Sequence, residues 1–222
     1  MSTIFVMPTL WTRPALHKRV LDSLYRQIHK GDRIIVAGNT CSDGFVGIPR
    51  GCDKLSFGPN TSAPRAINLA LELHMGEEYI CVFHDDLIIK DDAWLSKFID
   101  KFGIGGIGCI GIQLHSNSKP IPIDEEQNTF WVDWSDGVML IPSFVWKRCG
   151  EFDERMVGDC DPEDYCIRLR NLGYSNLCVQ PPHEHHQQHF QKKNPSIGWL
   201  KTVNETRKYF CKKHRIERPG WS

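Results

Sequence analysis

Short apolar runs alternate with amphipathic stretches along the first half of the chain. The apolar runs have the length and composition of buried strands and cover residues 3–7, 33–37, 54–57, 79–83 and 106–112. Between them, apolar residues recur at helical spacing, as in Leu16, Val20, Leu24 and Ile28. Residues typical of helix starts precede these stretches at Thr12, at Ser62 and at Asp91 or Asp92. This alternation predicts an α/β fold with a largely parallel sheet.

The second half of the chain has a less regular pattern. Strands are expected at 129–133 and 138–141, and a final helix at 196–214 has Leu200, Val203 and Phe210 facing inward. The sequence Asp161-Pro162-Glu163 predicts a helix start, with Asp161 as the N-cap, and Gly173 predicts the end of that helix. Residues 115–128 form a polar, proline-containing stretch that we interpret as a loop and a candidate lid on the acceptor side. No convincing linker interrupts the pattern, so we expect one domain over residues 1–222.

Composition and charge narrow the class of protein. The 222 residues include 27 basic and 27 acidic residues, a balance that argues against binding nucleic acid through bulk positive charge. We expect no membrane span and no signal peptide, because the apolar runs are only strand-sized; peripheral association with a membrane stays open. The nine cysteines are odd in number and scattered, and no C-x-x-C pair occurs. A reduced, cytoplasmic location fits this cysteine usage.

The carboxyl ends of three predicted strands carry polar residues. They are Pro8-Thr9, the turn from Gly38 to Gly44, and His84-Asp85-Asp86. Ligands of open α/β sheets bind at such ends, so these segments should meet in one crevice. Side chains alternate along an extended chain, so His84 and Asp86 would share one side and Asp85 the other. An imidazole and a carboxylate together suit a divalent cation. The alternative is a solvated pair of turn acids.

Two further groups of residues carry candidate chemistry. Glu163 and Asp164 lie at the start of a predicted helix, where one carboxylate can act as a general base; the alternative is that both serve the helix dipole. The run His183-Glu184-His185-His186 can supply a metal ligand, although it lacks the spacing of a structural zinc site and a solvated loop is the alternative.

Taken in order, these segments resemble the GT-A fold glycosyltransferases, in particular the large inverting family 2. The opening strand ends in Pro8-Thr9, and the next strand leads into a turn that contains Asn39 and Asp43. The segment with Arg65 and Asn68 is similar to the one that packs beside the nucleotide. Phe83-His84-Asp85-Asp86 stands at the DxD motif. Asp136-Gly137 and Gly150-Glu151-Phe152-Asp153-Glu154 are similar to the family's "G…vGgFDE" block, and Glu163-Asp164 with Arg168 and Arg170 matches its "EDxxxxxR" helix.

The resemblance implies a role for each of these residues. Asp86 would ligate the metal, completed by His186, which lines up best, or by its close rivals His183 and His185. Glu163 or Asp164 would be the catalytic base. The residues that would contact the donor are Pro8, Thr9, Asn39, Asp43, Arg65, Asn68, His84, Asp85, Asp136 and Gly137. The sequence departs from the family at Gly38, where an aspartate usually contacts the nucleobase, and at His84, which replaces the first aspartate of DxD.

By this resemblance we expect a single GT-A, Rossmann-like domain whose central sheet is mixed, mostly parallel and flanked by helices. Residues 1–113 would bind the nucleotide, 114–195 would form the acceptor and catalytic half, and 196–222 the C-terminal helix. The implied function is metal-dependent, inverting transfer of a sugar from a nucleoside-diphosphate sugar to a hydroxyl acceptor on a glycan, lipid or protein. The expected cofactor is Mn²⁺ or Mg²⁺, and the expected donor is a UDP-sugar, with GDP and dTDP as alternatives. A nucleotidyltransferase and a metal-dependent phosphoester hydrolase are the alternative functions.

Overall fold

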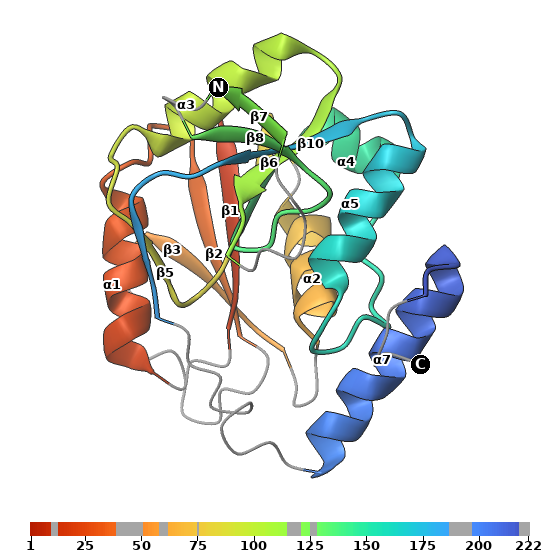
Figure 1. The fold of residues 1–222 in the computed structure, drawn as a ribbon. Coiled ribbons are helices and arrows are strands. Elements are labelled where there is room, and N and C mark those ends of the chain that lie inside the picture. The colour runs from red at the N-terminus through yellow and green to blue at the C-terminus, as the bar shows by residue number, and fades with distance from the viewer. Residues whose placement is uncertain are drawn as a thin grey trace.

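A nine-stranded sheet forms the centre of the structure, a computed structural model (Figure 1). The model describes residues 1–9, 13–38, 51–57, 62–74, 76–114, 121–124, 128–186 and 197–217. The strands are β1 (Thr3–Thr9), β2 (Arg33–Gly38), β3 (Cys52–Ser56), β4 (Tyr79–Phe83), β5 (Leu87–Ile89), β6 (Ile107–Ile112), β7 (Ile121–Asp124), β8 (Thr129–Val132), β9 (Val138–Pro142), β10 (Ser175–Val179) and β11 (His183–His185). The helices are α1 (Pro14–Tyr25), α2 (Ala63–His74), α3 (Trp94–Lys101), α4 (Ser143–Cys149), α5 (Asp161–Asn171) and α7 (Ile197–His214), with a 3-10 turn, η1 (Phe102–Ile104).

The strand order of the main sheet is β3-β2-β1-β4-β9-β6-β10-β8-β7. Neighbours pair in parallel from β3 to β4 and again between β6 and β10. Only β8 and β9, among the described strands of this sheet, run against the others. The sheet is therefore mixed and mostly parallel, as expected. Because β9 pairs with both β4 and β6, the two expected halves of the chain share one sheet.

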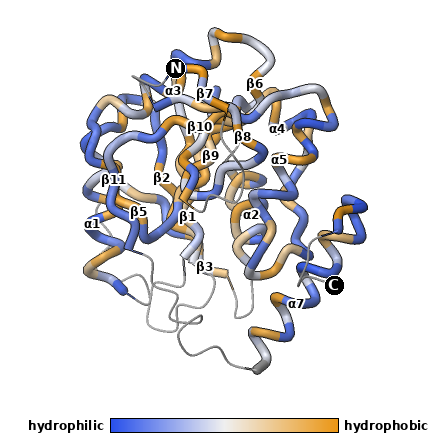
Figure 2. Tube along the Cα trace, viewed as in Figure 1, coloured by the Kyte–Doolittle hydropathy of each residue, from blue (hydrophilic) through white to orange (hydrophobic). Residues whose placement is uncertain are grey.

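Helices cover both faces of the sheet. Alternate residues of β1 point to opposite faces, with Phe5 and Met7 packed in one cluster and Ile4 and Val6 in the other. The first cluster is covered by α1 and α3, and the second by α2, α4 and α5 (Figure 1). Hydrophobic residues are concentrated in the strands between these layers (Figure 2). No helix in the described ranges has the length and apolar character needed to cross a membrane.

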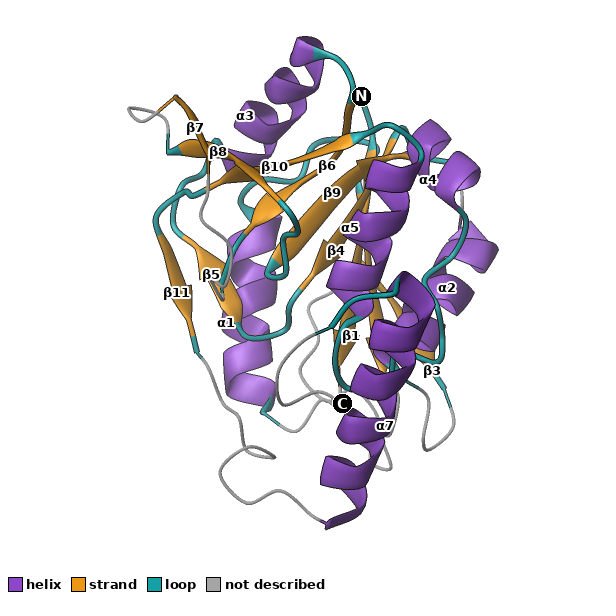
Figure 3. Ribbon diagram, turned by 45° about the vertical axis from the view of Figure 1, so that its right-hand side comes forward, coloured by secondary structure: helices purple, strands orange, loops and turns teal. Residues whose placement is uncertain are grey.

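A small two-stranded sheet lies beside the main one. Its strands, β5 and β11, pair antiparallel, with His185 opposite Leu87 (Figure 3). Leu87, Ile88 and Ile89 of β5 are all buried in the same cluster as α1. This packing fixes the position of β11, which carries the histidine-rich run.

The C-terminal helix α7 packs against the segment that leads into α5. Val203 and Phe210 are buried, and Phe210 contacts Met156 and Cys160 in a third, small cluster. Leu200, expected to face inward, is instead 42% exposed. Side chains also tie the helix down, since Arg207 Nε lies 2.6 Å from Asp159 Oδ2 and Tyr209 donates to Asp153 at 2.9 Å.

The regular elements of the first half begin and end near the residues that the pattern predicts. Ser62 caps α2, with Oγ accepting a hydrogen bond from the Arg65 amide at 3.3 Å. Asp91 accepts one from the Ala93 amide, just before α3. At α5 the N-cap is Cys160, in the left-handed region at φ 69°, and the expected cap Asp161 is the first helical residue. Thr12 lies outside the described residues.

The pattern did not predict β5, β7, α4, β10 or β11. Strand β7 falls within the stretch expected to be a loop, and it contains Pro122. A proline is tolerated there because β7 is the last strand of the sheet, with one edge unpaired. Most of the remainder of that stretch lies outside the described residues. Strands β5 and β11 are three residues each, too short to show a period.

Candidate active site

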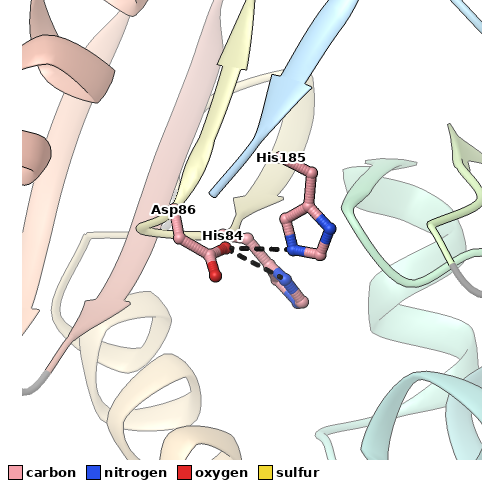
Figure 4. Close-up of side chains that lie close together, drawn as sticks. All are labelled: His84, Asp86 and His185. Atoms are coloured by element: carbon pink, nitrogen blue, oxygen red, sulfur yellow. Dashed lines mark ion pairs between the residues drawn. The ribbon is translucent and has the colours of Figure 1, made fainter. Parts of the chain in front are cut away.

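Three side chains that can bind a cation meet beyond the end of β4. His84 and Asp86 follow β4, and His185 comes from β11 (Figure 4). Asp86 Oδ1 lies 3.5 Å from His185 Nε2 and 4.0 Å from His84 Nδ1. The β5–β11 ladder creates this arrangement, because the backbone amide of His186 donates to the carbonyl of Asp86 at 2.8 Å. We call these three residues the His-Asp-His cluster.

The surroundings of the cluster keep its carboxylate ionised. Burial alone raises the pKa of Asp86, but a hydrogen bond with His185 and the nearby charges of His84, His185 and Arg13 outweigh it and lower the pKa. The side chains of Asp86 and His185 are 17% and 13% exposed, so the cluster is mostly screened from bulk water.

This set of donors fits a divalent cation. One ligand atom from each residue lies within 4.8 Å of the others. Two ligands at about 2.1 Å from one ion are roughly 3.0–3.4 Å apart at octahedral to tetrahedral angles. The separations from Asp86, 3.5 and 4.0 Å, are wider than this, and the two histidine nitrogens lie within 4.8 Å of each other, so the side chains must rotate inward to bring the three atoms onto one ion.

The other two candidate histidines face elsewhere. His186 is the histidine that lines up best with the family resemblance, but its Nε2 lies 3.1 Å from Glu184 Oε2. His183 directs Nδ1 to the carbonyl of Pro181 at 2.8 Å. Side chains alternate along an extended strand, so residues 184 and 186 lie on the side opposite to His185. Residue 183 lies on the same side as residue 185 but two positions, roughly 7 Å, away from it. Of the three, the structure brings His185 to Asp86.

Asp85 points away from the cluster, as the alternation predicts. Thr9 donates a hydrogen bond to Asp85 Oδ2 at 2.5 Å, and His17 Nε2 lies 3.2 Å from the same oxygen. His17 is only 1% exposed. Its contact with Asp85 links the first helix to the DxD position. Sequence reasoning missed His17, although it is a polar residue in the buried stripe of α1 beside Val20 and Leu21.

Asp164 is enclosed by the side chains of an arginine, a lysine and a histidine. It is 1% exposed and lies 2.9 Å from Arg168 Nε, 2.7 Å from His214 Nε2 and 2.5 Å from Lys213 Nζ. Both of its oxygens are engaged, and two of the partners come from α7. A carboxylate held in this way is unsuited to receive a proton from a substrate.

The carboxyl group of Glu163 has a raised pKa. It is partly buried, and burial together with the charges of Asp159, Asp161 and Asp136 raises its pKa to about 7. The pKa of Asp161 is likewise raised to about 7, first by burial and then by the charges of Asp159 and Asp164. A carboxyl group that titrates near neutrality exchanges protons readily at physiological pH.

A backbone hydrogen bond links His84 to the turn that carries Asp136 and Gly137. The amide of His84 donates to the carbonyl of Gly137 at 3.2 Å. Asp136, the preceding residue, is close enough to Glu163 for its charge to raise the pKa of Glu163. Asp136 Oδ1 accepts a hydrogen bond from the Leu114 amide at 2.6 Å, which fixes the turn before β9. Gly137 has no room for a side chain, because a Cβ there would lie 2.7 Å from Leu114 Cγ.

The remaining expected donor contacts have varied surroundings. Asn68 is buried, and its amide group bonds both the backbone amide and the carbonyl of Phe152, at 3.0 and 2.9 Å. Asn68 therefore fastens α2 to the loop after α4. Arg65 is exposed and lies 3.4 Å from Glu154. Pro8 lies near the end of β1, opposite Ala37. Asn39 and Asp43 lie outside the described residues.

Sequence comparisons find no relative, whereas structural comparison finds many. No protein-family model matches the sequence, and no curated protein matches it. Among solved structures, the mannosyltransferase PcManGT from Pyrobaculum calidifontis, in complex with GDP-Man and Mn²⁺, superposes with a TM-score of 0.68 at 16% identity, over 97% of this chain and 65% of that one. TarS 1-349 from S. aureus, in complex with UDP-GlcNAc, gives 0.65 at 11% identity over 95% of this chain and 67% of that one.

A third similar structure comes from an animal. The catalytic domain of Drosophila beta1,4galactosyltransferase 7, in complex with xylobiose, gives a TM-score of 0.62 at 12% identity, over 99% of this chain and 82% of that one. Identities this low speak to the fold alone. The chain therefore has the GT-A fold, and it spans about two thirds of the length of the first two enzymes.

Proposed function

We propose that this protein transfers a sugar from a nucleoside-diphosphate sugar to a hydroxyl acceptor, with inversion at the anomeric carbon. The observation that carries the proposal is the His-Asp-His cluster at the end of β4 of a GT-A fold, and the raised pKa of Glu163 supports it. A diphosphate leaving group needs a cation, and an attacking hydroxyl needs a base. The chain offers both kinds of group from separate elements.

Asp86 and His185 of the His-Asp-His cluster would hold the divalent cation, Mn²⁺ or Mg²⁺. When bound, such an ion supplies Lewis-acid stabilisation of the negative charge that develops on the departing diphosphate. One similar structure is a complex with GDP-Man and Mn²⁺, and another is a complex with UDP-GlcNAc. These complexes support a nucleotide-sugar donor for this protein. Asp85, held by Thr9 and His17, is the carboxylate best placed to accept hydrogen bonds from the donor's ribose or sugar hydroxyls.

Glu163 would be the base that takes the proton from the acceptor hydroxyl. Its raised pKa favours this role over Asp164, whose oxygens are occupied by Arg168, Lys213 and His214. Attack by the hydroxyl on the face opposite the diphosphate is a single in-line displacement, which inverts the anomeric centre. Asp164 instead anchors the start of α5, and with it the neighbouring Glu163.

The first test identifies the donor. Thermal unfolding is measured with UDP-, GDP- and dTDP-sugars, each with and without Mn²⁺. A ligand at about 100 times its Kd stabilises the folded state by about 2.7 kcal/mol, which is readily detected. We expect a metal-dependent shift with one nucleotide family, with UDP-sugars the first candidates.

The second test follows the reaction of that donor. Proton NMR of the product in the presence of a saccharide acceptor should show the anomeric configuration opposite to that of the donor. Release of pyrophosphate from a nucleoside triphosphate and a sugar phosphate would instead establish a nucleotidyltransferase. Turnover of a phosphoester without any sugar donor would establish a hydrolase.

A further inference from the structure

We propose that His84 is a third protein ligand to the cation, so that the His-Asp-His cluster binds a first-row transition metal before any nucleotide arrives. This inference concerns the cation site on which the proposed function rests. A site with one carboxylate depends on the phosphates of its substrate to hold the ion. Three converging protein ligands can hold it alone.

The position of His84 is fixed from two directions. Its backbone amide donates to Gly137, and its Nδ1 lies 4.0 Å from Asp86 Oδ1. His185 is held by the β5–β11 ladder. Figure 4 shows both imidazole rings turned toward the same carboxylate oxygen of Asp86. The protein chain alone therefore supplies three ligand atoms within 4.8 Å of one another.

The chemical nature of the ligands determines which ion they prefer. Two imidazoles and one carboxylate on one side, with the remaining positions open, suit borderline metals such as Fe²⁺, Co²⁺ and Zn²⁺. Mg²⁺ prefers oxygen ligands and keeps most of its water. We therefore expect affinity to increase from Mg²⁺ through Mn²⁺ to Co²⁺.

The ligand set also changes the charge that the donor meets. A divalent ion with one carboxylate and two neutral imidazoles carries a net charge of about +1. The same ion between two carboxylates would be neutral. The loaded site would therefore attract a diphosphate more strongly than a site with two aspartates, which is a consequence of having histidine at position 84.

The test is a titration of the tag-free, metal-stripped protein with Co²⁺ in the absence of nucleotide. Isothermal calorimetry gives the affinity and stoichiometry, and the visible absorption of Co²⁺ reports its ligands. We expect one ion per chain. We expect His84→Ala and His185→Ala each to weaken binding by more than the roughly 10-fold to 100-fold that the loss of an outer-shell partner costs. Mg²⁺ should compete poorly.

His183→Ala is the matched control, because His183 lies on the same strand but faces Pro181. It should bind Co²⁺ as the unmodified protein does. His84→Asp should narrow the preference for Co²⁺ over Mg²⁺, which a merely structural role for His84 would not predict. His84→Asn, nearly the same size, replaces the alanine variant if that one fails to fold.

Two results would overturn the inference. One is Co²⁺ binding that appears only after nucleotide is added. The other is a folded His84 variant with the affinity and absorption of the unmodified protein. Neither depends on glycosyl transfer, so a failure of the proposed function would show separately, as an absence of donor turnover in a protein that still binds metal.

Discussion

Glu163 and Asp164 are neighbours in the chain with opposite surroundings. The side chain of Asp164 contacts Arg168, Lys213 and His214, whereas the charges that act on Glu163 are those of other carboxylates. Burial, with repulsion from these like charges added to it, raises the pKa of Glu163 to about 7, which suits a base working at neutral pH. Under the proposed function, the same dipeptide thus supplies one structural and one reactive carboxylate.

At the scale of single residues, the first prediction concerns Glu163. Glu163→Gln should lower kcat by roughly 10²–10⁴-fold, because the amide cannot accept the acceptor's proton. In the unmodified enzyme kcat/KM should fall as the pH drops through about 7, where Glu163 becomes protonated. Asp161→Asn removes a like charge and should move this decline to lower pH. Glu205→Gln, on the exposed face of α7, is the control; an unchanged kcat in Glu163→Gln would exclude Glu163 as the base.

A second prediction separates Asp164 from catalysis. Asp164→Ala removes the buried carboxylate that Arg168, Lys213 and His214 all contact. Losing this shared partner should lower the free energy of unfolding by about 3–5 kcal/mol. Urea denaturation measures the loss. The control is Asp22→Ala, which removes an exposed ion pair with Lys18 at the same four-residue helical spacing and should cost about 0–1 kcal/mol. Equal losses in the two variants would contradict the structural role of Asp164.

The residues of the site could be predicted only where they are adjacent in sequence. His84, Asp85 and Asp86 follow a strong strand, and alternation alone predicts which two share a side. Choosing His185 from three histidines required knowing the register between β5 and β11, which no local pattern encodes. Likewise the contacts of Asp164 with Lys213 and His214 cross about fifty residues of chain.

At the scale of elements, α7 acts as a brace for the start of α5. Its Lys213 and His214 reach Asp164, and its Phe210 fills the small cluster with Met156 and Cys160. The helix therefore supports the carboxylates that precede and begin α5.

Phe210→Ala tests this brace. Removing a fully buried phenylalanine should cost about 3–5 kcal/mol. Amide hydrogen exchange should increase first in residues 197–214 and around 156–164. Leu200→Ala, at an exposed position of the same helix, should change exchange little. Exchange that stays slow throughout α7 in Phe210→Ala would show that the helix is held by something else.

Elements were predictable where they are long or regular. Strand β4 is found where its apolar run predicts. Helix α5 ends at Asn171, two residues before the glycine at position 173 that predicts its end. Strand β10 was missed because Ser175 and Asn176 begin it with polar residues; Asn176 is buried and donates to the carbonyls of Asp133 and Cys166. The fold class followed from the alternation of elements, whereas the sheet order depended on long-range pairing.

At the scale of the whole molecule, carboxylates with raised pKa values make stability depend on pH. Asp161 and Glu163 have ordinary pKa values near 4 and titrate at about 7 in the folded protein, so the folded state binds more protons between these values. Their contribution to the free energy of unfolding is therefore fully present at low pH and declines as the pH rises to about 7.

The corresponding prediction is a difference between two proteins. From pH 5 to pH 8 the unmodified chain, free of metal, should lose on the order of 2–4 kcal/mol relative to the double variant Asp161→Asn, Glu163→Gln. Urea denaturation at each pH measures both. Parallel pH profiles for the two proteins would contradict the raised pKa values.

The place of β9 in the sheet has a consequence for biosynthesis. A nascent chain that has emerged from the ribosome only as far as β6 lacks the strand that separates β6 from β4, so both strands still expose an unpaired edge. Such edges invite aggregation. The sheet is complete only after both β9 and β10 (residues 175–179) have been translated, so we expect these edges to stay exposed through most of synthesis.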